Sequence, residues 1–140
     1  MISYLDTSFL MKFYVLEADS QRAIDIATRN RIDPVISSLS EVEMASGLRS
    51  KALSTLAPDA AVAAYREFRR NAGRYRFAEI DGQVFGLARS LAEKYGATLH
   101  VRALDVLHVA AALNYGTAAF GTFDGRQASL AEATGLKLLR

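Results

Sequence analysis

Four acidic residues occupy positions from which they could do chemistry together. Each borders an apolar segment, where a solvated carboxylate is not the default expectation; they are Asp6, Glu43, Asp105 and Asp124. In a parallel α/β sheet all four can converge at the carboxyl ends of the strands, where such sheets place their active sites. Carboxylates packed together repel one another unless a cation neutralises them, so the pattern predicts a bound metal ion.

The composition narrows the kind of metal. The chain of 140 residues contains no cysteine, which excludes a thiolate site and a disulfide framework. It has only two histidines, which disfavours a histidine-rich zinc site. Oxygen ligands remain, and they favour magnesium or manganese.

The charge balance favours a polyanionic substrate. The formal net charge is +2, from 17 basic and 15 acidic residues. If the four acids form a site that a metal neutralises, 11 acidic residues remain against the 17 basic ones, a balance of +6. Arg66, Arg70 and Arg74 recur every four residues and form either a solvated helix face or a contact for an RNA backbone.

Strand-like and helix-like segments alternate along the chain. Helices between strands indicate parallel crossover connections and a sheet that is covered on both faces. We therefore expect one domain over residues 1–140, an α/β fold with three α/β/α layers around a central parallel sheet of about five strands. The expected strands are 2–6, 34–37, 76–80, 118–123 and 136–139, and the expected helices are 7–16, 20–30, one opened by Ser40, 58–73, 82–95, 103–115 and 126–134.

Each of the four acids also has a structural alternative. Asp6 and Asp124 can cap the helices that follow them. Asp105 lies near a helix N-terminus, where the helix dipole stabilises a carboxylate. Glu43 can be the partner of Ser40 in a capping box, and on local grounds this assignment is favoured.

Geometry must decide between Glu43 and its neighbour Glu41, which points to nearly the opposite side of the helix. The apolar residues of this helix suggest an inward face on the side of Glu43; they are Val42, Ala45, Leu48 and Leu53.

Two further residues flank Asp105. His108 lies one turn later on the same helix face and is either a core histidine, the favoured assignment, or a functional one. Arg102 precedes Asp105 and either binds phosphate or is solvated at the surface.

Taken in order, these segments resemble a known family. Residues 4–10 (YLDTSFL), Ser40-x-x-Glu43, residues 104–113 (LDVLHVAAAL) and residues 121–124 (GTFD) resemble the PIN domain. They are most similar to the VapC toxins of bacterial toxin–antitoxin pairs. Each motif alone is weak, whereas the ordered set covers essentially the whole chain.

The resemblance implies a Mg²⁺- or Mn²⁺-dependent endoribonuclease that hydrolyses RNA with a metal-activated water. On this analogy Asp6, Glu43, Asp105 and Asp124 are the catalytic and metal-binding acids, with Asp6 and Asp105 as the foremost direct ligands. Thr7 and Thr122 support the site, and Arg102 and His108 contact the substrate. The family further implies a homodimer and a small VapB-like antitoxin that blocks the active site.

Other assignments fit less well. A haloacid-dehalogenase-type phosphatase needs a second aspartate where this chain has Ser8, a receiver domain needs an early acidic pair, and no Walker phosphate loop is present. The serious alternative is a catalytically silent PIN-like module that binds RNA or a partner. The chain shows no basic leader, and its uncharged stretch 106–123 contains polar residues unsuited to a membrane span, so a cytoplasmic protein is expected.

Overall fold

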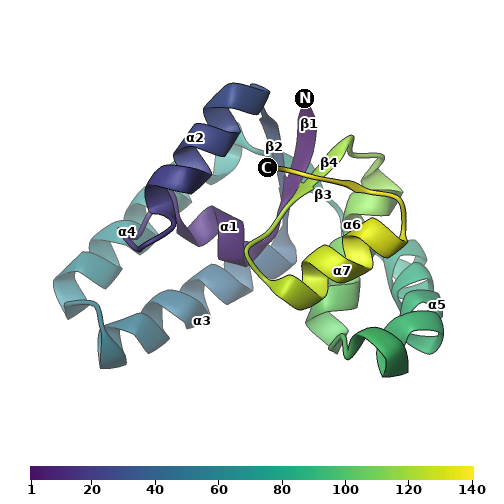
Figure 1. The fold of residues 1–140 in the computed structure, drawn as a ribbon. Helices are drawn as coiled ribbons and strands as arrows, with labels where there is room; N and C mark the ends of the chain where they lie inside the picture. The colour runs from purple at the N-terminus through teal and green to yellow at the C-terminus, as the bar shows by residue number, and fades with distance from the viewer.

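The computed structural model describes residues 1–140 apart from the side chains of Ala52 and Leu53. Within the described chain, five strands form one parallel sheet in the order β3-β2-β1-β4-β5 (Figure 1). The strands are β1 (Ile2–Leu5), β2 (Asp33–Ser37), β3 (Arg76–Ala78), β4 (Ala119–Gly121) and β5 (Lys137–Leu138). The helices are α1 (Thr7–Met11), α2 (Ser20–Asn30), α3 (Ser38–Ser54), α4 (Pro58–Asn71), the 3₁₀ turn η1 (Ala72–Arg74), α5 (Gly82–Leu99), α6 (Ala103–Tyr115) and α7 (Gly125–Ala133).

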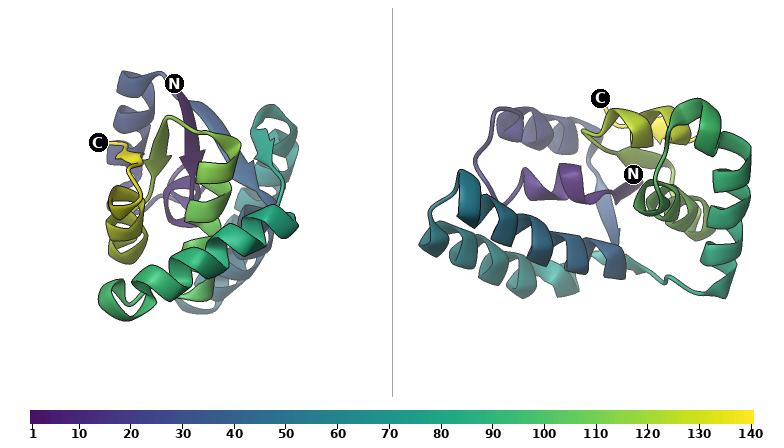
Figure 2. Two further views of the ribbon diagram at one scale, coloured as in Figure 1. Left: turned by 90° about the vertical axis from the view of Figure 1, so that its right-hand side faces the viewer. Right: turned by 90° about the horizontal axis from the view of Figure 1, so that it is seen from below.

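Helices cover both faces of the sheet, which confirms the expected three-layer sandwich. Alternate residues of a strand point to opposite faces. Tyr4, Val35 and Phe120 lie side by side in the sheet and pack against α5, α6 and α7. Their chain neighbours Leu5 and Ile36 face the other way, toward α1–α4. The two groups of helices lie on opposite sides of β1 in Figures 1 and 2.

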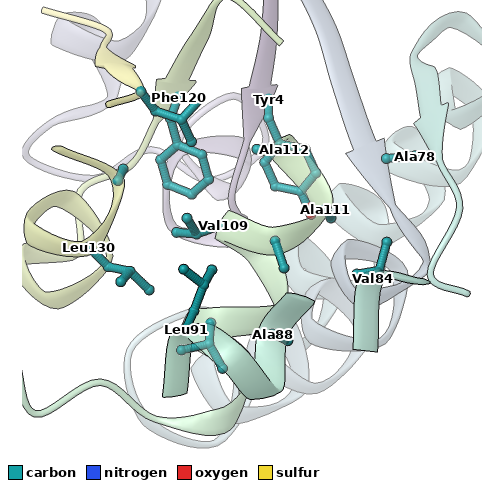
Figure 3. Close-up of a cluster of buried hydrophobic side chains, with 14 of the residues drawn as sticks. Tyr4, Ala78, Val84, Ala88, Leu91, Val109, Ala111, Ala112, Phe120 and Leu130 are labelled. Carbon is teal, nitrogen blue, oxygen red and sulfur yellow. The ribbon is translucent and has the colours of Figure 1, made fainter. Parts of the chain in front are cut away.

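The face toward α5–α7 holds the larger core cluster (Figure 3). The rings of Tyr4 and Phe120 are stacked with centroids 5.6 Å apart. Below them lies α6, whose residues 109–112 are all buried because this helix is enclosed by the sheet, α5 and α7. The small alanine side chains of α6 allow close packing against its neighbours. This packing holds in place the helix that carries Asp105 and His108.

The predicted helices exist, but several of their boundaries differ, and three of these differences have a clear physical cause. The first α-helix ends at Met11 rather than Leu16, because the amide groups of residues 12–14 bond three residues back and tighten the chain into a turn. Helix α5 continues through Gly96 to Leu99 and ends with His100 in the left-handed conformation, at φ 53°. An interior glycine costs only about 1 kcal/mol, so packing of Leu99 against the core outweighs it.

The third difference concerns the capping box of α3. The helix begins at Ser38, and the box joins Ser37 with Ser40 rather than Ser40 with Glu43. Strand β2 runs to Ser37, so the helix starts two residues before the predicted Ser40. Glu43 therefore has no capping function and its carboxylate is available for other contacts.

The predicted inward face of α3 is also wrong in part. Val42 is 70% exposed and Ala45 is exposed, whereas Met44 and Leu48 are buried. Leu53 lies outside the described residues. Among the helices described, none combines the length and apolar character needed to cross a membrane.

Candidate active site

A cleft of about 710 Å³ opens where β1 and β4 end and α6 and α7 begin, and residues of α1 and α3 complete its lining. Three of the four predicted acids line it: Glu43, Asp105 and Asp124. The fourth, Asp6, is fully buried and is connected to the cleft through Ser8, a lining residue. The structure thus gathers the four acids around one cleft from four separate elements.

Sheet register explains the position of Asp6. Leu5 pairs with Gly121 in the adjacent strand, so the residues that follow them, Asp6 and Thr122, leave the sheet side by side. The Thr122 hydroxyl donates to Asp6 Oδ2 over 2.6 Å, and the Ser8 hydroxyl lies 2.7 and 2.9 Å from the two carboxylate oxygens. Asp6 also caps α1 by accepting from the Phe9 amide at 2.9 Å.

These bonds hold a carboxylate that burial disfavours. Burial raises the pKa of Asp6 above its ordinary value of 3.8, and the hydrogen bond from Thr122 and the nearby His108 oppose that rise only in part. A cation close to Asp6 would favour its charged form. The site therefore contains a buried acid whose ionisation is coupled to whatever positive charge the cleft holds.

Glu43 is held from two sides. Its Oε1 accepts from the Thr7 hydroxyl at 2.9 Å and contacts Nε2 of His108. Burial alone raises the pKa of Glu43, but the hydrogen bonds and charge of its partners, chiefly His108, bring it below its ordinary value. Glu41, its neighbour on α3, points elsewhere and pairs with Arg69 at 3.1 Å.

His108 is completely buried and lies between Glu43 and the core. Its Nδ1 is 2.8 Å from the Tyr4 hydroxyl, which in turn lies 2.8 Å from the Ser37 hydroxyl. This chain of contacts anchors the ring, so that the ring orients Glu43. In this arrangement His108 contacts Glu43 and does not line the open cleft.

Asp105 and Asp124 both stand at helix starts. Asp105 is buried in the first turn of α6 and accepts from the Arg102 amide at 2.8 Å. Asp124 caps α7 by accepting from the amides of Arg126 and Gln127 at 2.9 and 3.1 Å. The structural alternatives for these acids are therefore present, and capping fixes each side chain beside the cleft.

The hydroxyl groups of Thr122 and Ser8 connect Asp6 with the segment that carries Asp124. Thr122 Oγ1 donates to Asp6 and accepts from the Asp124 amide at 2.9 Å, so one hydroxyl orients two of the acids. Ser8 lies under Asp6 and accepts from the Phe123 amide at 2.8 Å. The function of Ser8 was missed from the sequence, although its spacing of two residues from Asp6 is typical of such a side-chain turn.

The cleft also carries basic residues. Lys12 and Lys51 both pair with Glu17, and Arg102 is exposed at the rim. Arg126 contacts Asp105 and Asp124 at 3.8 and 3.6 Å. Sequence reasoning missed Arg126, because only the fold brings the first turn of α7 beside α6.

The donor chemistry of the cleft fits an oxygen-ligated divalent cation. Asp105, Asp124 and Glu43 offer carboxylate oxygens, and Gln127, 7% exposed, has a buried carbonyl oxygen that meets no donor among the described residues. The side chains do not form a complete coordination site, since among the described residues no three acids or histidines lie close enough to bind one ion together. Mg²⁺ keeps several waters of its own and needs only one or two direct carboxylates.

Comparison with known proteins places this geometry in context. The sequence matches the PIN domain family over residues 3–133. No curated protein sequence matches the chain.

Several solved structures share the fold. VapC20 of Mycobacterium tuberculosis, a sarcin-ricin loop cleaving toxin, is 18% identical with a TM-score of 0.69 over 96% of this chain and 95% of that one. VapBC-1 of nontypeable Haemophilus influenzae is 17% identical with a TM-score of 0.69, covering 99% and 96% of the two chains. A toxin–antitoxin complex from Klebsiella pneumoniae is 13% identical with a TM-score of 0.62, covering 87% and 86%.

Proposed function

This chain belongs to the PIN domain family, and from that premise we propose that it is a metal-dependent endoribonuclease toxin of a toxin–antitoxin pair. The observation that carries the proposal is the gathering of Asp6, Glu43, Asp105 and Asp124 around one cleft. Fold neighbours that are toxins support the same assignment.

The four acids are the proposed holders of Mg²⁺ or Mn²⁺. When bound, such an ion supplies a more acidic water and charge stabilisation at the phosphate. The chain supplies orientation: backbone amides fix Asp105 and Asp124, and Thr7 and His108 fix Glu43. Side chains held in advance need no rearrangement when charge develops, which favours catalysis.

The proposed substrate is RNA, approached by the basic rim of the cleft. Arg102 is exposed at that rim, and Lys12 and Lys51 line the cleft, so a phosphate backbone would meet positive charge there. We assign His108 to the positioning of Glu43, because its ring is buried behind that carboxylate. Thr122 and Ser8 play the corresponding part for Asp6.

The proposed partner is a small VapB-like antitoxin that closes the cleft. Support comes from the fold neighbours, since one of them is a toxin–antitoxin complex from Klebsiella pneumoniae and another is VapBC-1. We further propose that residues 1–140 act as one PIN domain, that two copies form a homodimer and that the protein works in the cytoplasm.

RNA cleavage tests the proposal directly. Purified protein is incubated with total RNA in Mg²⁺ or Mn²⁺, and the cut ends are mapped. We expect cleavage that EDTA abolishes and that Glu43→Gln reduces at least about 100-fold, a loss typical of removing one electrostatic group from an active site.

Glu41→Gln is the matched control, because Glu41 lies on the same helix and pairs with Arg69 outside the cleft. It should cut RNA like the unmodified chain. Equal loss in both variants would refute the assigned site. RNA binding without cleavage in either metal would instead favour the catalytically silent binding module.

A further inference from the structure

Arg126 places a positive charge against two of the proposed metal-binding acids. Its Nε lies 3.8 Å from Asp105 Oδ2, and its Nη2 lies 3.6 Å from Asp124 Oδ2. Among the described residues, no other lysine, arginine or histidine side chain comes within 4.0 Å of either carboxylate. The guanidinium thus offsets one of the two negative charges of the pair on which a divalent cation would depend.

The neighbouring acids Glu17 and Glu43 contact other groups. Glu17 pairs with Lys12 and Lys51, and Glu43 contacts His108. The charge of Arg126 is therefore directed at Asp105 and Asp124 alone, from the first turn of α7 that Asp124 itself caps.

The contacts of Arg126 are those of a displaceable group. Both distances exceed normal hydrogen-bond lengths, so the guanidinium is held by charge rather than by the two parallel hydrogen bonds of a tight arginine–carboxylate pair. Its side chain is 39% exposed, so the guanidinium has access to solvent. The pair is therefore available to a competing cation.

A second observation in the same turn points to a ligand. Gln127 follows Arg126, lines the cleft and is 7% exposed. Its Oε1 is buried and meets no donor among the described residues. A buried carbonyl oxygen left in this way is costly, and a hydrated cation beside Asp124 would bring a donor to it.

We propose that Arg126 is an internal counter-ion that competes with the divalent cation for Asp105 and Asp124. Without metal, its guanidinium screens the two carboxylates from each other. When the cation binds, Arg126 gives way and its charge becomes available to the anionic substrate in the cleft. This inference rests on the proposed function, because it requires a cation at these acids.

Direct binding of Mn²⁺ tests the competition without any RNA. The protein is stripped with EDTA, dialysed and titrated with Mn²⁺ by calorimetry. Arg126→Gln should bind Mn²⁺ with a Kd about tenfold lower than the unmodified chain, because the competing charge is gone. Arg126→Lys, which keeps the charge, should bind with a Kd within about twofold of the original.

Arg102→Gln is the matched control, because it removes the same charge from the same cleft. The Arg102 side chain forms no ion pair among the described residues, and only its amide contacts Asp105. Its Kd should fall by no more than about twofold. An equal gain in Arg102→Gln and Arg126→Gln would overturn the proposal, since it would reflect general electrostatics.

The Mn²⁺ titrations distinguish failure of the counter-ion proposal from failure of the proposed function. If the unmodified chain binds Mn²⁺ and Arg126→Gln binds it no more tightly, only the counter-ion proposal fails. If no form binds Mn²⁺, the metal site of the proposed function fails as well. Far-UV circular dichroism of each variant establishes that the compared proteins are folded, and Asp105→Asn, which should weaken binding, locates the ion.

Discussion

Replacing Asp6 separates what its charge does from what its hydrogen bonds do. Asp6→Asn keeps an acceptor for the Phe9 amide, and its new amide group can donate to the hydroxyls of Ser8 and Thr122 once these turn. Asp6→Ala removes every one of these partners. The two variants should therefore differ sharply in stability although both lose the carboxylate.

The contacts set the expected magnitudes. Loss of the helix cap in Asp6→Ala costs about 1 kcal/mol, and buried hydroxyls left without an acceptor add about 1–3 kcal/mol. Part of the lost free energy is recovered, because the hydroxyl oxygens of Ser8 and Thr122 lie 3.3 Å apart and can form a hydrogen bond with each other. We expect a loss of about 2–4 kcal/mol for Asp6→Ala, but for Asp6→Asn a free energy of unfolding equal to, or up to about 1 kcal/mol above, that of the unmodified chain.

The pH dependence has a definite sign. The folded-state pKa of Asp6 lies above its usual 3.8, so ionisation opposes folding, and the unmodified chain loses stability as pH rises through that value toward the folded pKa. Asp6→Asn has no such group. Its advantage should be absent below the usual pKa and should grow as pH rises above it.

Urea unfolding followed by far-UV circular dichroism at pH 4 and pH 8, in EDTA, measures these differences. Comparing each variant with the unmodified chain at the same pH cancels the other titrating groups. The reasoning would be refuted if Asp6→Asn were destabilised at pH 8 as strongly as Asp6→Ala, because the charge itself would then be stabilising.

Two further predictions concern stability elsewhere in the chain. Gly121→Ala should cost about 1–3 kcal/mol, because its Cβ would lie 2.8 Å from Leu5 Cδ2 and 3.0 Å from Leu139 Cδ1 in a packed core. Gly47→Ala, whose Cβ would meet only the flexible end of Met11 at 2.9 Å, should cost less than about 1 kcal/mol; equal losses in urea unfolding would contradict this account. Glu17→Gln should lose about 1 kcal/mol at pH 7, measured in the same way. Burial alone raises the pKa of Glu17, but its two lysine partners hold it below 4.5, so the difference should vanish as pH falls through the folded pKa; a constant difference would argue against the ion pairs.

The order of elements could be predicted because hydrophobic pattern and turn residues act locally. Each expected strand lies at or within two residues of an observed one, and Gly116 ends α6 in the left-handed conformation, at φ 79°. The predicted end of α5 at Gly96 is wrong, because a glycine permits a helix end without requiring one. Packing of Leu99, which is remote in sequence from much of the core it meets, decided the boundary.

The shared location of the four acids could be predicted from the expected sheet topology. The side chains that contact them could not. An aspartate that follows a strand is predicted to lie at the carboxyl ends of the parallel strands, and Asp6 and Asp124 lie there. The capping box was predicted between Ser40 and Glu43 but joins Ser37 with Ser40, and that error gave Glu43 a local function it does not have. Arg126 could not be found from the sequence, because its contact with Asp105 depends on how α6 and α7 pack.

The order of the sheet has a consequence for biosynthesis. The central strand β1 is made first, yet its neighbour β4 and the helix α7 belong to the last quarter of the chain. Asp6 receives the hydrogen bond from the Thr122 hydroxyl only when residue 122 has been translated, so the complete cleft cannot assemble before then. Joining segments so distant in sequence is also a slow step of folding. A chain that ends before β4 therefore lacks Asp124, Arg126 and Gln127 from the cleft and, on the proposed function, the activity that depends on them.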